Sequence, residues 1–217
     1  MSTALAQRSV DRALAARRAA YGDEVRRLVD ATFALVRDSG ELEPRVGAIV
    51  RAAGLSNQAF YRHFRSKDEL LVTVLDDGVR QLADYLAHRM ERAASPRERV
   101  RAWIAGVCQQ ALDAEAAAAT RPFALSRARL SELFPNEVAE SERQLTDGLR
   151  RAIEAARQDG GQDGEQAPGD ARRDAQVVYG LAMGWLQQQL GRDRRPDAAD
   201  AEHLIDFALR GLGFGGT

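Results

Sequence analysis

Residues 46–71 read VGAIVRAAGLSNQAFYRHFRSKDELL, and this stretch indicates the fold of the N-terminal part of the chain. It predicts two short helices, at about 44–53 and 57–64, joined by a tight turn that contains Gly54. Ser56 is placed to cap the second helix, because its hydroxyl can accept a hydrogen bond from a free N–H of the first turn. Two short helices with a glycine in the turn are typical of a helix-turn-helix, whose second helix enters the major groove of DNA.

The residues before this stretch predict an arm and a first helix. Residues 1–20 are rich in Ala and Arg and have no clear core pattern, so we expect a flexible arm, with a partly helical arm as the alternative. Apolar residues at helical spacing then predict a helix at about 22–39, with Gly40 as its C-terminal cap. Pro44 suits the first position of the next helix, where its missing N–H costs nothing. The DNA-binding head is therefore expected at 21–68.

The residues after this stretch predict a long helix and then an entirely helical body. Ser66 caps the long helix, and Glu69 three residues later completes a capping box. No β-strand pattern and no internal repeat is found, so the expected fold class is all-α, with a ligand-binding and dimerisation body at 69–217. We expect helices at about 66–92, 95–112, from Pro122 onward, 135–158, 171–190 and 198–212, a flexible loop at 159–170 and a glycine-rich tail.

The N-terminal part and the remainder of the chain differ in net charge. Residues 1–68 carry 12 Arg and Lys against 8 Asp and Glu, a balance of +4, while residues 69–217 carry 19 against 24, a balance of −5. A basic head on an acidic remainder fits a DNA-binding module joined to a body with another task. No apolar run reaches the roughly 18 residues that a membrane span needs, and no secretory signal is recognisable, so we expect a cytoplasmic protein.

The second short helix carries side chains that are suited to reading DNA. Asn57 or Gln58 can pair with adenine through two hydrogen bonds, and Ala59 can meet a thymine methyl group. Ser56 lies beside them, and Arg62 further along can reach guanine or phosphate. The candidates for phosphate contact are Arg45, Tyr61, Lys67 and His63, the last of which could equally be a solvated surface residue, while Phe60 and Phe64 are expected in the core.

This pattern resembles the DNA-binding segment of the TetR family of bacterial transcriptional regulators, over roughly the first third of the chain. The resemblance rests on Ala53-Gly54-Leu55-Ser56, Phe60-Tyr61, Phe64 and Ser66-Lys67-Asp68-Glu69-Leu70-Leu71. It implies that Tyr61 and Lys67, the only lysine of the chain, contact the DNA backbone. It also implies a small-molecule effector and a dimer made by the last two helices. The chain departs from the family at Pro44 and Arg45, where small hydroxyl residues are usual.

Apolar and aromatic residues of the body are candidates to line a pocket for an apolar or amphipathic small molecule. Each of them taken alone is more often a core residue than a ligand contact. The candidates are Trp103, Val107, Phe123, Leu130, Phe134, Leu149 and Trp185, and Gln109, Arg127 and Arg129 could meet a polar ligand group.

The two C-terminal helices carry apolar stripes that can form half of a four-helix interface between two copies of the chain. Gly180 and Gly184 would let another helix approach closely. Packing within a single protomer is the alternative. The candidates for the dimer interface are Val178, Leu181, Trp185, Leu204, Ile205, Ala208 and Leu209.

Catalytic motifs and metal-binding spacings are missing from the sequence. It has no Gly-x-Ser-x-Gly, phosphate-binding loop or His-Glu-x-x-His, a single cysteine, and three histidines without ligand spacing, so we expect no enzyme, no cofactor and no metal. The favoured interpretation is a homodimeric, ligand-responsive repressor of a palindromic DNA operator. The alternatives are a DNA-binding protein without an effector and an enzyme on a helical scaffold.

Overall fold

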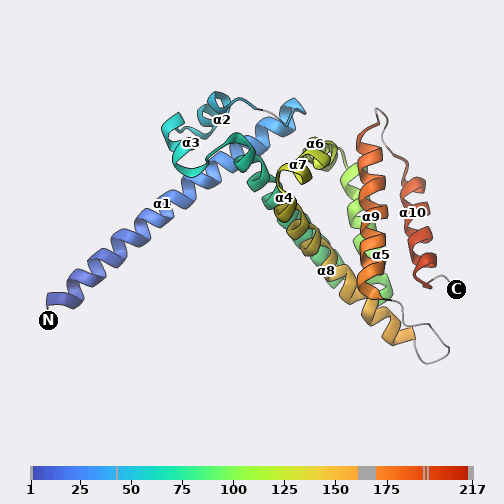
Figure 1. The fold of residues 1–217 in the computed structure, drawn as a ribbon. Coiled ribbons are helices and arrows are strands. Elements are labelled where there is room, and N and C mark those ends of the chain that lie inside the picture. Colours follow the sequence, from blue (N-terminus) through green and yellow to red (C-terminus); the bar gives the residue numbers. More distant parts are fainter. Residues whose placement is uncertain (1, 43, 161–169, 193, 195, 215–217) are drawn as a thin grey trace. The chain divides into compact units, whose positions relative to one another are not determined.

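The computed structural model describes residues 2–42, 44–160, 170–192, 194 and 196–214. Every regular element in these ranges is an α-helix, which confirms the all-α fold class (Figure 1). The chain divides into two compact units, which we name the head (residues 1–74) and the body (residues 75–217). The helices are α1 (Ser2–Ser39), α2 (Val46–Ala53), α3 (Asn57–His63), α4 (Lys67–Glu91), α5 (Pro96–Leu112), α6 (Ala114–Leu125), α7 (Arg127–Leu133), α8 (Pro135–Gly160), α9 (Ala171–Leu190) and α10 (Ala198–Gly211).

Local hydrogen bonds set the ends of the short helices in the head. The Ser56 hydroxyl accepts a hydrogen bond from the Ala59 N–H at 3.1 Å, which confirms Ser56 as the cap of α3. Gly54 ends α2 with a φ of 63°, in the left-handed region that favours glycine. At the start of α4 the Ser66 hydroxyl accepts from the Glu69 N–H at 3.1 Å. The core that these helices enclose includes Leu28, Ile49, Phe60 and Leu70.

Three helix boundaries differ from the predictions. The first helix begins at Ser2 and not near residue 22, because the Ala-rich segment favours helix and contains no glycine or proline to interrupt it. α2 begins at Val46, so Pro44 precedes the helix instead of occupying its first position. Pro122 does not start a helix but lies buried inside α6. Most of the predicted loop at 159–170 and of the glycine-rich tail falls outside the described residues.

The core of the body forms around α5, which packs against α6, α8, α9 and α10. Ser95 caps α5 by accepting a hydrogen bond from the Glu98 N–H, and Pro96 occupies the first turn, as the sequence predicts. Figure 1 shows α9 and α10 side by side, and both pack against α5. None of the described helices is long and apolar enough to cross a membrane. Large side chains that are fully buried in this core include Trp103, Ile104, Leu149, Ile153 and Leu186.

Candidate DNA-binding surface

The first turns of α3 present polar side chains to solvent. Asn57 and Gln58 are exposed, and Tyr61 is 63% exposed on the same short helix. The Ser56 hydroxyl is used by the backbone as a cap, so Ser56 positions the helix as well as bordering its exposed face. Amide side chains at the start of such a helix can form paired hydrogen bonds with adenine, and a phenol beside them can bind phosphate.

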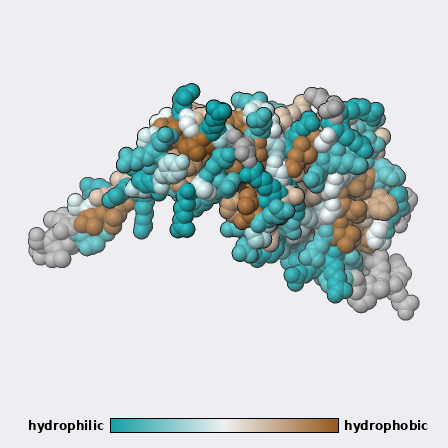
Figure 2. Space-filling model, turned by 45° about the horizontal axis from the view of Figure 1, so that its top comes forward, coloured by the Kyte–Doolittle hydropathy of each residue, from teal (hydrophilic) through white to brown (hydrophobic). Residues whose placement is uncertain are grey.

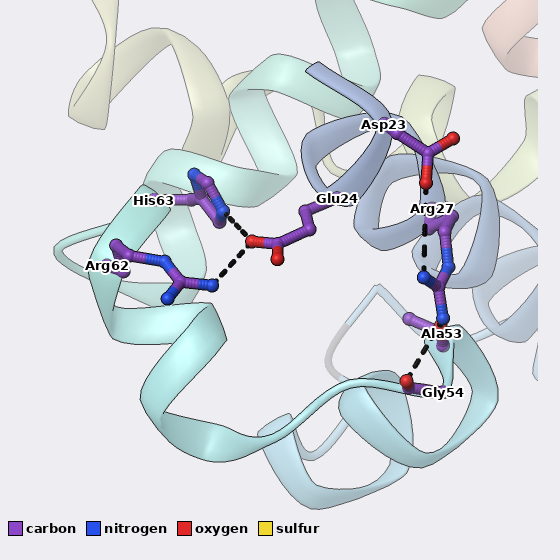
Figure 3. Close-up of polar contacts among 7 residues, drawn as sticks. All are labelled: Asp23, Glu24, Arg27, Ala53, Gly54, Arg62 and His63. Atoms are coloured by element: carbon purple, nitrogen blue, oxygen red, sulfur yellow. Dashed lines mark hydrogen bonds and ion pairs between the residues drawn. The ribbon is translucent and has the colours of Figure 1, made fainter. Parts of the chain in front are cut away.

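Arg27 on α1 holds the turn that connects α2 to α3. Its Nη2 donates hydrogen bonds to the carbonyl oxygens of Ala53 and Gly54, the second at 3.0 Å (Figure 3). Asp23, one helical turn earlier, lies 3.9 Å from the other terminal nitrogen of Arg27. A Cβ atom at Gly54 would lie 2.8 Å from Arg27 Nη2. The turn therefore needs glycine for its backbone conformation and for the space that Arg27 occupies.

Glu24, also on α1, binds the C-terminal end of α3. Its Oε2 lies 2.6 Å from Arg62 Nη2 and 2.6 Å from His63 Nε2 (Figure 3). The hydrogen bonds from His63 and from Arg62 hold the pKa of Glu24 below its ordinary value. Tyr21 adds ring contacts, since its ring centre lies 5.2 Å from that of His63 and 5.4 Å from the Arg62 guanidinium carbon. α1 is thus connected to the C-terminal end of α3 and, through Arg27, to the turn that precedes α3.

The structure corrects one predicted base contact and shows that the side chains of two other predicted DNA contacts are already bonded within the head. Ala59 is only 5% exposed and packs with Phe60 into the head core, so its methyl group cannot meet a thymine. Helical periodicity is the reason, because it turns positions 59 and 60 inward when 57, 58 and 61 face outward. Arg62 and His63 are bound to Glu24, so a phosphate would have to share them with that carboxylate.

Two further predicted phosphate contacts lie at helix starts. Arg45 is exposed and precedes the first residue of α2, and its side chain makes no capping hydrogen bond. Lys67 is the first residue of α4 and is half-buried. Free N–H groups at a helix start favour anions, so both cations occupy positions that suit a phosphate.

Tyr21, Glu24 and Arg27 are site residues that the sequence did not predict. Arg27 acts on a turn 26 residues away, and Glu24 acts on side chains 38 and 39 residues away. No local spacing rule connects positions so far apart. The only local signal was that these polar residues lie near the apolar stripe of α1. Polar residues in the same positions also occur on ordinary helices whose outer face is solvated.

In the body, the residues predicted to line a pocket fall into two groups. Trp103, Val107, Leu130 and Leu149 are buried, and the indole N–H of Trp103 donates to the carbonyl oxygen of Leu145 at 3.0 Å. The other three, Phe123, Phe134 and Trp185, are half-buried. The first group has the environment of a packed core, and the second retains some exposure.

A half-buried polar cluster lies at the junction of α7, α8 and α9. Arg127 donates to the Tyr179 hydroxyl at 2.7 Å and forms an ion pair with Glu142. Burial raises the pKa of Tyr179. Of the three polar residues that the sequence suggested for a ligand group, Arg127 is therefore already paired within the chain.

Most of the predicted dimer-interface residues pack inside the protomer, which is a correction to the prediction. Val178, Ile205, Ala208 and Leu209 are at most 6% exposed and belong to the core of the body, because the widest apolar stripe of each helix faces α5. Trp185 and Leu204 are half-buried against this core, and Leu181 is exposed. The outward faces of α9 and α10 carry Val177, Gly180, Leu181, Gly184 and Phe207.

Neither a metal site nor a reactive thiol is present in the described part of the chain. No group of three or more His, Cys, Asp or Glu side chains there could hold a metal ion. Cys108 is buried, and this burial raises the pKa of its thiol to about 12. The thiol therefore stays protonated and unreactive in the folded protein.

The helix-turn-helix geometry agrees with a family comparison. Residues 28–74, from the last third of α1 to the first turns of α4, match the model of the bacterial regulatory proteins of the tetR family. The helix-turn-helix segment of the chain is therefore similar to the DNA-binding segment of that family.

Individual proteins are similar to longer parts of the chain. The HTH-type transcriptional regulator BetI of Rhizobium meliloti is 38% identical over 77 residues, which cover 36% of this chain and 38% of BetI. A TetR-family regulator from Mesorhizobium loti has the same fold over 88% of this chain and 96% of its own, with a TM-score of 0.65 and 18% identity. FadR of Bacillus subtilis, in complex with stearoyl-CoA, aligns over 85% of this chain and 97% of its own, with a TM-score of 0.67 and 17% identity. The curated relative thus matches little more than a third of the chain, whereas the solved structures share its fold over most of its length.

Proposed function

We propose that this protein is a cytoplasmic transcriptional repressor of the TetR family. In this proposal it binds a palindromic DNA operator as a homodimer and releases it when a small apolar or amphipathic effector binds the body. The observation that carries the proposal is the exposed pair Asn57 and Gln58 at the start of α3. α1 binds the C-terminal end of this helix through Glu24 and the turn before it through Arg27. A rigid helix with exposed amides is what reading of base edges requires.

The contacts to DNA divide into those that read bases and those that position the head. Gln58 and Asn57 are assigned to base edges. Tyr61, Lys67 and Arg45 are assigned to phosphates, which supply affinity without sequence preference. Arg62 is assigned to a phosphate that it shares with Glu24.

The outward faces of α9 and α10 support the proposed dimer. Val177 is 61% exposed, Leu181 37% and Phe207 54%, which is unusual for large apolar side chains. A Cβ atom added at Gly180 or Gly184 would meet nothing within 4 Å, so another helix has room to approach. Contact of these faces in two copies would give a two-fold symmetric dimer, whose paired recognition helices require a palindromic site.

An effector site in the body is supported by the half-buried aromatics and by one similar protein. FadR of Bacillus subtilis has the same fold and was crystallised with stearoyl-CoA. In this chain Phe123, Phe134 and Trp185 are the predicted pocket residues that keep some exposure. An effector can release DNA only through its different affinities for the DNA-bound and DNA-free conformations.

A second candidate function is favoured by the buried residues of the body. Trp103, Val107, Leu130 and Leu149 are at most 2% exposed, and Trp103 satisfies its indole N–H within the chain. Such packing is expected of a body that only dimerises. The second candidate is therefore a DNA-binding regulator without an effector.

Selection of duplexes from a random-sequence pool by the full chain tests the DNA-binding part. We expect enrichment of a palindrome, and a dimer bound to each selected duplex in sedimentation velocity. The matched variant Gln58→Ala should enrich a site with weaker preference at one position of each half. A wild-type protein that enriches no sequence would contradict the proposed function.

The selected duplex then tests the effector part. A panel of fatty acids, acyl-CoA thioesters and small phenols is screened for release of DNA and for a shift in tryptophan fluorescence. A true effector weakens DNA binding by the same factor by which DNA weakens effector binding. If no compound changes the thermal stability or the DNA affinity, the regulator without an effector becomes the preferred assignment.

A further inference from the structure

We propose that the exposed start of α1, residues 7–20, is a second DNA-binding element that holds the backbone next to the site read by α3. We name this segment the arm. The inference rests on the proposed DNA-binding function and adds a contact that the helix-turn-helix does not contain. It commits to one partner, the phosphate backbone of the same duplex.

Charge is the first observation that supports this role. The arm carries Arg8, Arg12, Arg17 and Arg18 against one carboxylate, Asp11, a balance of +3. Residues 21–68 carry 8 Arg and Lys against 7 Asp and Glu, a balance of only +1. Most of the net positive charge of residues 1–68 therefore comes from the arm and not from the helix-turn-helix segment. A protein that binds DNA gains affinity from each cation that neutralises a phosphate.

The second observation is that these arginines are not paired within the protein. All residues of the arm are exposed, and no carboxylate in the described part of the chain forms an ion pair with Arg8, Arg12, Arg17 or Arg18. The one acidic side chain of the arm, Asp11, accepts a hydrogen bond from Gln7 instead. On α4, by contrast, the exposed Arg80 pairs with Asp76 at 3.0 Å. The arm therefore keeps its cations available for an external anion.

The third observation is that the arm is joined rigidly to the recognition helix. α1 runs without interruption from the arm to Glu24, which binds the end of α3. At the junction the Tyr21 ring lies 5.7 Å from the Arg17 guanidinium carbon and 5.4 Å from that of Arg62. Two guanidinium groups around one ring would be stabilised by a nearby phosphate.

Helix geometry gives the reach of the arm. At about 1.5 Å per residue, Arg8 lies about 20 Å before Tyr21 along the helix axis. This distance corresponds to roughly six base pairs at about 3.4 Å each. The contact should therefore involve base pairs that flank the selected palindrome. Figure 2 shows the projecting arm as a mainly hydrophilic surface with one apolar patch, and Val10 and Leu14 are its exposed large apolar residues.

The test compares three full-length proteins on two duplexes that contain the selected palindrome. One duplex ends at the palindrome and the other extends ten base pairs on each side. The arm variant carries Arg8→Gln, Arg12→Gln, Arg17→Gln and Arg18→Gln, which keep helix propensity and remove charge. The matched control removes four exposed arginines of the body, with Arg99→Gln, Arg121→Gln, Arg151→Gln and Arg172→Gln. Affinity is measured against salt concentration for each pair.

We expect wild type and control to bind the long duplex more tightly than the short one, and the arm variant to bind both alike. The slope of log affinity against log salt should fall by about 2 to 4 for each protomer in the arm variant, at about 0.9 for each lost phosphate contact. A second variant, with only Arg8→Gln and Arg12→Gln, leaves the contacts at Tyr21 intact. Its salt slope should fall by about 1 to 2 for each protomer. Circular dichroism should show unchanged helix content.

Two outcomes would overturn the inference while leaving the proposed function in place. One is an arm variant with wild-type slope and wild-type preference for the long duplex. The other is a changed sedimentation coefficient in the absence of DNA, which would show that the arm contacts a second copy. Failure of wild type to select any duplex would instead refute the proposed function itself.

Discussion

In the head, the side chains proposed to act lie on the exposed surface of a short helix, whereas in the body most of the side chains predicted to act are buried. Asn57, Gln58 and Tyr61 face solvent, while Trp103, Val178 and Ile205 are at most 3% exposed. The difference follows from helix length and neighbours. α3 has only one side covered, whereas α5 and α9 are packed against several helices. In a short helix that is covered on one side, the polar residues identify the functional face. In a helix that is packed against several others, an apolar stripe identifies the core and not an interface.

The largest effect is expected where the body is most tightly packed. Trp103→Ala should lower the free energy of unfolding by about 3–5 kcal/mol, because it leaves a cavity and removes the hydrogen bond to Leu145. Thermal unfolding followed by circular dichroism measures it, and the half-buried Trp185→Ala is the matched control, with a smaller loss. A loss of about 1 kcal/mol at Trp103 would indicate that it borders an existing cavity instead of filling the core.

The distinction between inward and outward faces of α9 and α10 predicts two different outcomes for the same kind of substitution. Leu181→Asp should leave the protomer folded and dissociate the dimer, because the charge would be buried only in the interface. Ile205→Asp should unfold the protomer, at a cost of about 3–5 kcal/mol for a buried unpaired charge. Sedimentation velocity and thermal melting separate the two. A Leu181→Asp protein that remains dimeric would place the interface elsewhere.

In the head, removal of a side chain that is proposed to contact DNA should weaken DNA binding while the helical fold is kept. Gln58→Ala should cost about 1–3 kcal/mol on the selected operator and relax its preference at one base pair. Lys67→Ala should weaken binding to all duplexes and lower the salt slope by about one for each protomer. Fluorescence anisotropy on selected and scrambled duplexes distinguishes the two. Equal losses on both duplexes for Gln58→Ala would contradict its assignment to a base.

The turn in the head should be sensitive to a single methyl group. Gly54→Ala should destabilise the protein by about 1–2 kcal/mol from the left-handed backbone conformation, with a further loss because Arg27 must move. Chemical denaturation measures the change. In the double variant Gly54→Ala with Arg27→Ala, the added methyl group no longer displaces the Arg27 side chain. The loss of stability of the double variant should therefore be smaller than the sum of the two single losses. Full additivity would mean that Arg27 does not restrict the turn.

The smallest expected effect concerns the pH dependence of the α1–α3 connection. Bonding to His63 and Arg62 lowers the pKa of Glu24 from 4.5, so its contribution to stability is present above pH 4.5 and lost as the pH falls through the lower folded value. Glu24→Gln should therefore reduce the melting temperature above pH 4.5 and converge with wild type in acid. A constant difference at all pH values would show that the carboxylate charge is not involved.

The sequence by itself determined the all-α fold, the order of most helices and the position of the helix-turn-helix. The reason is that caps, the glycine turn and apolar periodicity act within a few residues, as Ser56, Gly54 and Ser66 show. It also identified the exposed amides of α3 and the absence of a catalytic motif.

Only the tertiary structure decided which apolar stripe of α9 and α10 faces the core and that Ala59 points inward. It also decided that Arg27 connects α1 to the turn before α3 and that Glu24 connects α1 to the C-terminal end of α3. These features depend on contacts between residues that are distant in sequence. Helical periodicity tells which residues share a face, but the neighbouring helices decide which way that face points.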